Sequence, residues 1–463
     1  MSREPSSQQQ IPATELNIRE VVDSRPMSRF HYALLALGGS VMFLDGFDTQ
    51  AISFAAPAIA KEWGLPAASL GPILSAAIAG LMAGYLALAP LANRIGHRRI
   101  VLVCTTIFGV LTLLCAFADT ALQLIALRFL TGAGLGAAIP SIVALVSEFA
   151  PTRRRSSFVM FIYCWLALGF VAAGIVSGIV IPMWGWRSMF IIGGSLPLLL
   201  LVPLIRYFPE SPTYLCRSGA RQRAVETLRR LAPGLSSNVV LLAETLQPTG
   251  LEKSSPFTLV RGQWLVPTVL LWIAFMTNLA AFYAIQSWLP TIISAQGHSP
   301  SLAIAATVLT TIGGVAAATV IGPAMDRINA FRVLGSVYVG GAVFVAILGS
   351  VLMGTSAGLL LMAAFLTGTC VAGGQMSVIA LATVVYPTAM RPTGVGWALG
   401  IGRIGGIAGP LLVGAALGAQ MSSSSIFVMM ALVLVGASAS VFALERRLRT
   451  AAVERRMSPS PTG

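Results

Sequence analysis

Charge is scarce in this chain. Of its 463 residues, 10% are charged and 56% are hydrophobic, whereas about 25% of residues are charged in a typical soluble domain. Apolar runs of about 20 residues, the length that crosses a bilayer as a helix, recur along the whole sequence. This composition excludes a water-soluble globular protein and predicts one that crosses the membrane many times.

Residues that bind metals or carry out covalent chemistry are equally sparse. The three histidines are far apart and none of the five cysteines forms a CxxC pair, so we predict neither a metal site nor a disulfide framework. Neither of the two lysines follows a glycine, so the GxxxxGK[ST] loop of an ATP-driven pump is absent. No Ser-His-Asp or Cys-His arrangement is recognisable. We therefore expect no enzyme activity, no metal and no cofactor.

Twelve apolar segments are long enough to be spanning helices. They lie at 31–56, 69–92, 99–118, 122–147, 157–181, 188–207, 266–293, 301–325, 332–353, 356–385, 394–418 and 425–444. A polar stretch separates the first six from the last six, which predicts an all-α polytopic membrane protein with two pseudo-symmetric six-helix bundles. The predicted parts are an N-terminal tail (1–30), a first bundle (31–207), a central loop (208–265), a second bundle (266–445) and a C-terminal tail (446–463).

The positive charge is distributed unevenly along the chain. The formal net charge is +14, but if the amino terminus is cytoplasmic, only Lys61 and Arg187 of the 30 Lys and Arg residues fall in outer loops. Arg128 and Arg403 fall inside helices, and the other 26 lie in inner loops and tails, as the positive-inside rule requires. We therefore predict a multi-pass protein of the cell (inner) membrane with both termini in the cytoplasm and no nucleic-acid partner. The polar start of the chain indicates that no signal peptide is cleaved.

Two short motifs recur in the inner loops of both halves. "ANRIGHRR" (92–99) follows the second segment, and "MDRINAFR" (325–332) follows the eighth, 233 positions later. "APTRRR" (150–155) follows the fourth segment, and "YPTAMR" (386–391) follows the tenth, 236 positions later. The nearly equal offsets indicate a duplicated six-helix unit. Many secondary transporters bind their substrate between two such units.

The first segment carries two carboxylates, Asp45 and Asp48, within "FLDGFDTQ" (43–50). A charge at mid-bilayer costs about 3 kcal/mol on insertion scales, so it persists where it faces protein or a wet cavity. The two residues are three apart and share a helix face, and neighbouring buried carboxylates disfavour each other's ionised form. One of them could thus take up and release a proton near neutral pH. The alternative is that both are structural, bonded to backbone or to a permanent arginine partner.

The other ionisable groups inside the segments narrow the choice of proton carrier. No lysine lies in these segments and the one histidine, His31, is at the very edge of the first, while arginine does not deprotonate, so Asp45 and Asp48 are the candidates for proton coupling. Arg403, in the glycine-rich "GIGRIGG", suits a substrate carboxylate, which its fork binds bidentately, or else forms a permanent salt bridge between two helices. Arg128, at the start of "RFLTGAGLG", has a coupling or binding role or is a helix-packing arginine.

The seventh segment mixes aromatic and amide side chains that could hold an arene. Phe275, Phe282 and Gln286 fall near one stripe at helical spacing. The alternative for any single aromatic residue is packing in the core or against lipid, and for Trp288 anchoring at the membrane interface. The candidate substrate-binding residues are Arg403, Arg128, Phe275, Asn278, Phe282, Gln286 and the similarly ambiguous Trp397.

Several of these stretches resemble the major facilitator superfamily. "APLANRIGHRR" is similar to its inner-loop signature, "RFLTGAGLG" to its fourth-helix signature, and "PESPTYL" to the end of its sixth helix. "LDGFDTQ" and "YPTAMRPTGVGWALGIGRIGGIAGPLL" resemble, more narrowly, the aromatic acid:proton symporters. "AIPSIVALVSEFAP" and "SWLPTII" fit the same family.

The resemblance implies a functional set of residues. This set is Asp45, Asp48, Arg128, Asp326, Arg391 and Arg403. Gating at the inner face is implied for Asn93, Arg94, Asp326, Arg327 and Arg391. Asn93 stands where the superfamily has Asp, so the first inner gate lacks a charge, and its pairing should be weaker than a carboxylate's.

We therefore expect proton-coupled import of a small aromatic carboxylate, such as a hydroxybenzoate, by alternating access. The partners are this acid, protons and membrane lipids, and the resemblance implies a monomer. A proton-driven exporter of drugs or metabolites on the same fold is one alternative, although Arg403 argues mildly against it, since most such substrates are cationic or neutral. A membrane chemoreceptor is another, but the central loop and C-terminal tail are too short for a signalling domain of ordinary size.

Overall fold

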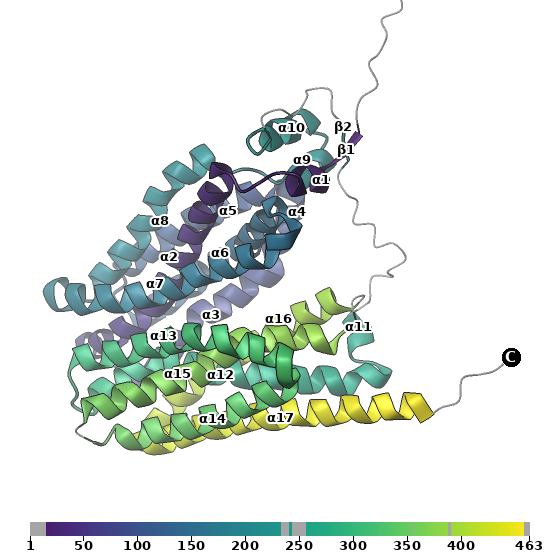
Figure 1. The fold of residues 1–463 in the computed structure, drawn as a ribbon. Coiled ribbons are helices and arrows are strands. Elements are labelled where there is room, and N and C mark those ends of the chain that lie inside the picture. The colour runs from purple at the N-terminus through teal and green to yellow at the C-terminus, as the bar shows by residue number, and fades with distance from the viewer. Residues whose placement is uncertain (1–14, 233–239, 243–255, 355, 388–389, 458–463) are drawn as a thin grey trace, which may run out of the picture.

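The computed structural model describes residues 15–232, 240–242, 256–354, 356–387 and 390–457, and its long helices follow the predicted apolar segments (Figure 1). The six long helices of the first bundle are α2 (Arg29–Trp63), α3 (Leu70–Ala87), α5 (His97–Cys115), α6 (Ala121–Phe149), α7 (Arg155–Trp184) and α8 (Arg187–Tyr207). Those of the second bundle are α12 (Leu265–Ala295), α13 (Pro300–Ala324), α14 (Ala330–Val351), α15 (Ala357–Val385), α16 (Arg391–Gly418) and α17 (Ser423–Met457). The all-α polytopic fold is confirmed.

Equivalent helices of the two halves pack in the same way. In the first bundle α2 contacts α7, α3 contacts α6, and α5 contacts α8; in the second, α12 contacts α16, α13 contacts α15, and α14 contacts α17. Small residues allow this close packing in both halves. A Cβ atom at Gly46 of α2 would lie 2.1 Å from the carbonyl oxygen of Leu166, and one at Gly405 of α16 would lie 1.8 Å from that of Met276. The duplicated unit read from the inner-loop motifs is therefore present in the packing.

Several helix boundaries differ from those predicted by hydropathy, and two of them have a clear physical reason. A π-helical turn, Met325–Asn329, joins α13 to α14, so that Pro300–Val351 form one continuous helical stretch. Helix α17 continues to Met457, past the end of its apolar part, because the Arg-, Ala- and Glu-rich residues that follow are good helix formers. Hydropathy locates the part of a helix that lies in lipid. The helix itself continues as long as the following residues have a high helix propensity.

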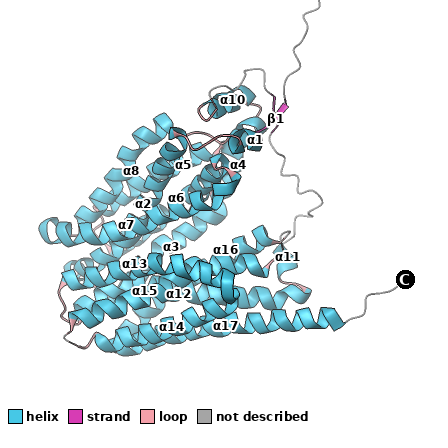
Figure 2. Ribbon diagram, in the orientation of Figure 1, coloured by secondary structure: helices cyan, strands magenta, loops and turns pink. Residues whose placement is uncertain are grey.

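A small unit covers one end of the first bundle, and it contains two short strands that the sequence did not predict (Figure 2). Strand β1 (Glu15–Asn17) pairs in parallel with β2 (Val240–Leu242). Three short helices lie beside the strands, α1 (Ile18–Asp23), α9 (Pro212–Arg217) and α10 (Arg221–Arg229). Their apolar side chains join one core cluster with Phe149 and Phe208 at the ends of α6 and α8. The remaining short helices are α4 (Ala92–Ile95) and α11 (Pro256–Leu259).

The end of the molecule that carries this unit and the carboxyl end of α17 is called here the terminal end, and the other the far end. The bundles meet towards the far end, where α3 contacts α16, α7 contacts α13, and α2 contacts α12 (Figure 1). Among the residues that the structure describes, two hydrogen bonds cross between the bundles. Gln50 Nε2 donates to the carbonyl of Gln286 at 3.1 Å, and the Ser75 hydroxyl donates to that of Ile407 at 3.0 Å.

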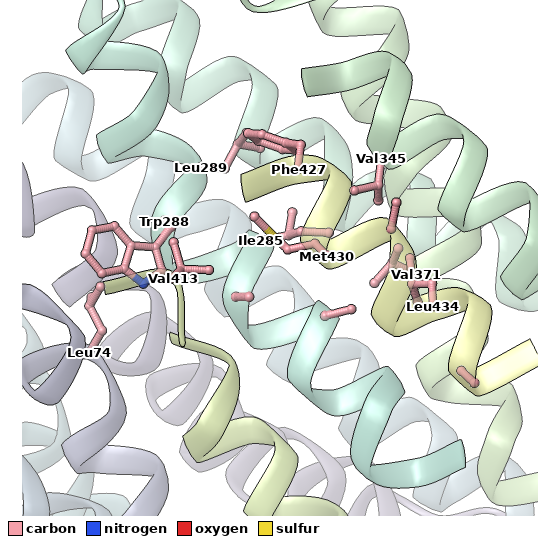
Figure 3. Close-up of a cluster of buried hydrophobic side chains, with 14 of the residues drawn as sticks. Leu74, Ile285, Trp288, Leu289, Val345, Val371, Val413, Phe427, Met430 and Leu434 are labelled. Carbon is pink, nitrogen blue, oxygen red and sulfur yellow. The ribbon is translucent and has the colours of Figure 1, made fainter. Parts of the chain in front are cut away.

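The apolar part of this contact brings α3 against the second bundle. Leu74 of α3 points toward the indole of Trp288 on α12 (Figure 3), and both side chains are buried in one cluster with residues of the second bundle. The Trp288 indole nitrogen donates to the carbonyl of Pro410 on α16 at 3.0 Å. The buried indole thus belongs to the closure between bundles and not to an interfacial anchor.

Candidate substrate and proton site

Asp48 and Arg128 form an ion pair inside the first bundle. Arg128 Nη1 donates to both carboxylate oxygens of Asp48, at 2.7 and 2.6 Å, and Nη2 donates to the Asp48 carbonyl at 3.2 Å. The Thr112 hydroxyl adds a donor to the carboxylate at 3.2 Å. Asp48 is 1% exposed and Arg128 is not exposed at all. The pair therefore has the geometry of the permanent arginine partner that was the structural alternative, and Arg128 presents no open donor to a ligand.

Asp45, one helical turn before Asp48, has no comparable partner. Its side chain is 3% exposed, and its Oδ1 atom accepts no hydrogen bond. Among the described residues, no basic side chain lies within 4 Å of its carboxylate, although Asp48, Arg403 and Arg128 are close enough to act on it electrostatically. Because a buried carboxylate without a paired cation disfavours its charged form, Asp45 is suited to take up a proton.

Arg403 lies near the middle of α16 and holds its guanidinium between the two bundles. The Nη1 group donates to the Tyr283 hydroxyl of α12 at 2.9 Å, and the guanidinium carbon lies 5.5 Å from the centre of the Tyr85 ring of α3. No other hydrogen bond from Arg403 occurs in the described part of the chain, yet none of its nitrogens is both buried and unpaired. Its remaining N–H groups thus keep accessible surface and can donate to a carboxylate.

The amide residues predicted on the seventh segment are occupied by protein partners. Gln286 donates to Thr311 at 3.0 Å and accepts from Thr310 at 2.7 Å, so its amide is bound within the second bundle. Asn278 is fully buried and donates to the Val371 carbonyl at 3.4 Å, while its Oδ1 has no partner. These hydrogen bonds hold both amides to other helices of the second bundle, and none of the bonds involves Arg403.

The aromatic candidates are placed differently from one another. Phe275 is fully buried and packs against Gly402 of α16. A Cβ atom at Gly402 would lie 3.2 Å from the Phe275 side chain. Phe282 is half-buried, with its ring centre 5.1 Å from that of Tyr283. Trp397 is 44% exposed and stacks on Trp272, with 6.1 Å between ring centres. Of the three, Phe282 is the one whose ring contacts Tyr283, the residue that accepts a hydrogen bond from Arg403.

The five predicted gating residues lie at the terminal end, and their side chains are exposed. They are Asn93, Arg94, Asp326, Arg327 and Arg391. None of them takes part in an ion pair with any described residue. The two bundles are therefore in contact at the far end, whereas the predicted gating residues form no ion pair among the described residues at the terminal end.

Sequence reasoning missed two tyrosines of this site, Tyr85 on α3 and Tyr163 on α7. Both lie within electrostatic range of Arg403, Asp45 and one another. The rule that selected polar aromatic side chains on the seventh segment could have found them, since each is a phenol within an apolar helix. No spacing on a single helix connects Tyr85, Tyr163 and Arg403, so the sequence alone does not place the three together.

Two repeated six-helix bundles with ionisable groups between them define a secondary transporter. The model of the Major Facilitator Superfamily matches residues 39–335 and 271–462, and the chain belongs to that superfamily. Its relatives place it, more narrowly, in the aromatic acid:proton symporter family. This membership also confirms the expectation that the protein is not an enzyme.

These relatives align over nearly their whole length. A 4-hydroxybenzoate transporter, PcaK, of Pseudomonas aeruginosa is 37% identical, over 95% of this chain and 97% of its own. A gallate transporter of Pseudomonas putida is 34% identical, over 92% and 95%. A benzoate transport protein of Acinetobacter baylyi is 29% identical, over 94% and 93%. A multi-pass membrane location follows from this family and from the apolar helices.

Solved structures confirm the fold. The inward-facing, unoccupied structure of a bacterial homologue of the human lysosomal transporter Spinster has a TM-score of 0.72 at 15% identity, covering 94% of this chain and all of the other. The xylose transporter XylE of E. coli, in a partially occluded inward-open conformation, has a TM-score of 0.69 at 16% identity, covering 89% and 99%.

Proposed function

We propose that the protein imports a small aromatic carboxylate, of the hydroxybenzoate kind, together with protons by alternating access. The observation that carries this proposal is that a buried acid without a paired cation, Asp45, and a cation with further donors, Arg403, lie within electrostatic range of one another in the middle of the molecule. The names of the relatives support the substrate class, because they transport 4-hydroxybenzoate, gallate and benzoate.

The orientation follows from the charges of the loops. With the terminal end in the cytoplasm, the inner loops and tails carry nearly all of the Lys and Arg residues, in agreement with the positive-inside rule. In the cell membrane this makes the far end the outer end. The conformation described here is then open toward the cytoplasm, with the gating residues apart. In the outward-open conformation Asp326 and Arg391 would hold the inner end closed.

Arg403 binds the carboxylate of the substrate, and Asp45 carries the proton. When Asp45 is ionised, its charge competes with the substrate for Arg403, since both are anions within range of the same guanidinium. Protonation of Asp45 removes this competition, so that proton and substrate favour one another's binding. The loaded site is neutral and the bundles can rock around it.

Asp48 and Arg128 serve as a fixed pair that positions Asp45. Removal of either partner from a buried pair leaves an uncompensated charge, so we assign proton coupling to Asp45 and a structural role to Asp48. One proton then moves with one monovalent anion, transport is electroneutral, and the pH difference alone drives it. A second proton would add the membrane potential, worth about 2.3 kcal/mol per charge at 100 mV. The protein acts as a monomer surrounded by lipid.

Uptake into proteoliposomes tests the proposal. Radiolabelled 4-hydroxybenzoate and benzoate are supplied outside vesicles with an imposed pH difference, acidic outside. We expect accumulation above the external concentration, and its loss when a protonophore is added. Accumulation that is unaffected by the protonophore, or a lack of transport of both acids, would refute the proposal.

A further inference from the structure

Three phenols surround the Arg403 guanidinium, and each comes from a different helix. Tyr85 lies on α3, Tyr163 on α7 and Tyr283 on α12. The first two belong to one bundle and the third, like Arg403, to the other, so this tyrosine cage spans the space between the bundles. All three lie within electrostatic range of Arg403.

The three phenols are not equivalent. The Tyr283 oxygen accepts a hydrogen bond from Arg403 Nη1 at 2.9 Å. Its ring lies against Gly406 of α16, where a Cβ would approach it to 2.9 Å. These contacts fix Tyr283 to the helix that carries Arg403. Tyr283 thus belongs to the carboxylate end of the site, where it orients the guanidinium.

Tyr85 and Tyr163 keep their hydroxyl groups free. Neither hydroxyl forms a hydrogen bond within the described residues, and neither is a buried unpaired atom. Tyr163 is 43% exposed although it lies within range of Arg403 and Asp45, so its exposed surface faces the space between the bundles. Tyr85 places its ring under the guanidinium, with 5.5 Å between the guanidinium carbon and the ring centre. A phenol both donates and accepts hydrogen bonds, and its ring stacks on other arenes.

We propose that Tyr85 and Tyr163 recognise a hydroxyl group on the substrate ring, so that the preferred cargo is a phenolic carboxylate and not the unsubstituted acid. This inference rests on the proposed function of the same site. The carboxylate is held by Arg403 and Tyr283, and the aromatic ring extends from it between the two free phenols. An acid that lacks the ring hydroxyl leaves these phenols without the partner that replaces water, and it therefore binds less tightly.

The test compares matched acids in matched variants. The KM values for benzoate, 3-hydroxybenzoate and 4-hydroxybenzoate uptake are measured in the wild type and in Tyr85→Phe, Tyr163→Phe and Tyr283→Phe. In the wild type we expect a lower KM for at least one hydroxylated acid than for benzoate. Loss of one hydroxyl from Tyr85 or Tyr163 should reduce this preference about fivefold, the typical net value of one hydrogen bond, because the KM for the hydroxylated acids rises more than the KM for benzoate. Tyr283→Phe should raise KM for all three acids alike.

The outcomes separate this inference from the proposed function. Equal KM values for benzoate and both hydroxybenzoates in the wild type, or an unchanged preference in both Tyr85→Phe and Tyr163→Phe, would overturn the recognition of a ring hydroxyl while import itself stands. Absence of proton-driven uptake of all three acids by the wild type would overturn the proposed function. The melting temperature in detergent serves as the control for folding, and each variant should melt close to the wild type.

Discussion

Closure of the far end depends on backbone contact between Gly414 of α16 and the start of α3. A Cβ at Gly414 would lie 3.1 Å from the Gly71 Cα, 3.3 Å from the Gly71 nitrogen and 3.3 Å from the Ala68 carbonyl oxygen. All three are backbone atoms, which cannot rotate away as a side chain can. Gly414→Ala should therefore force the bundles apart at this point, at the cost of about 1 to 3 kcal/mol typical of overpacking.

This cost falls on the conformation that is closed at the far end, because the contact joins the two bundles. The equilibrium should shift toward the conformation open at the far end by about 5-fold to 150-fold. Leu74→Cys is a suitable reporter, since Leu74 is 3% exposed and packs in this closure (Figure 3). In a background without the five native cysteines, Gly414→Ala should speed its labelling by a membrane-impermeant thiol reagent about fivefold or more.

Gly400→Ala is the matched control for this substitution. It lies in the same helix, and a Cβ there meets nothing within 4 Å, so it gains the same helix propensity, about 1 kcal/mol, without touching the other bundle. Equal labelling rates in Gly414→Ala and Gly400→Ala would refute the argument that this backbone contact holds the far end closed.

Three further substitutions test other parts of the molecule. Asp48→Asn should cost about 3 to 5 kcal/mol of stability, because it leaves Arg128 unpaired. The double variant Asp48→Leu with Arg128→Met should have a higher melting temperature in detergent than Asp48→Asn. The reverse order would contradict the pairing. Arg403→Lys keeps the charge but loses the fork, so KM for 4-hydroxybenzoate should rise about tenfold, and an unchanged KM would exclude Arg403 from carboxylate binding. Asp23→Asn should speed hydrogen exchange in α1, because Asp23 accepts from the Thr152 amide and hydroxyl at 2.7 and 2.6 Å; unchanged exchange would show that this contact does not hold α1.

The pH dependence of the Asp23 contact has a definite sign. Partial burial alone would raise the pKa of the Asp23 carboxyl, but the Thr152 hydrogen bonds and the nearby Arg19 charge hold it below its ordinary value of 3.8. A lowered pKa in the folded protein means that the contact stabilises above about pH 3.8 and is lost as the pH falls through the lower folded value. We therefore expect exchange in α1 to be constant, after correction for intrinsic rates, between pH 5 and pH 8.

The sequence predicts the helices of this protein well, because crossing a bilayer demands long apolar segments and leaves a strong signal. It also locates Asp45, Asp48, Arg128 and Arg403, since a charge within such a segment stands out. It does not predict how they pair. The spacing of Asp45 and Asp48 does not distinguish the two acids. The packing of α6 against α2 brings Arg128 to Asp48 and leaves Asp45 without a paired arginine.

The parts of the site that were missed depend on contacts between helices. No pattern within a single helix connects Tyr85 or Tyr163 with Arg403, and they become part of the site because α3 and α7 face α16 across the space between the bundles. For Gln286, the helix pattern was informative but the contacts with another helix were not foreseen. Its position on the stripe with Phe275 and Phe282 was correct for a helix, but the hydroxyls of Thr310 and Thr311 on α13 occupy its amide. The strands β1 and β2 are three residues each, too short to leave an alternating pattern.

The central claim is that Asp45, alone among the buried acids, gains and loses a proton as the carrier cycles. The most direct test is the number of protons that enter with each substrate molecule, measured with a pH-sensitive dye inside proteoliposomes during uptake of labelled 4-hydroxybenzoate. We predict one proton per substrate in the wild type and none in Asp45→Asn, which should still exchange labelled for unlabelled substrate across the membrane. Two protons per substrate in the wild type, or proton entry that persists in Asp45→Asn, would contradict the account.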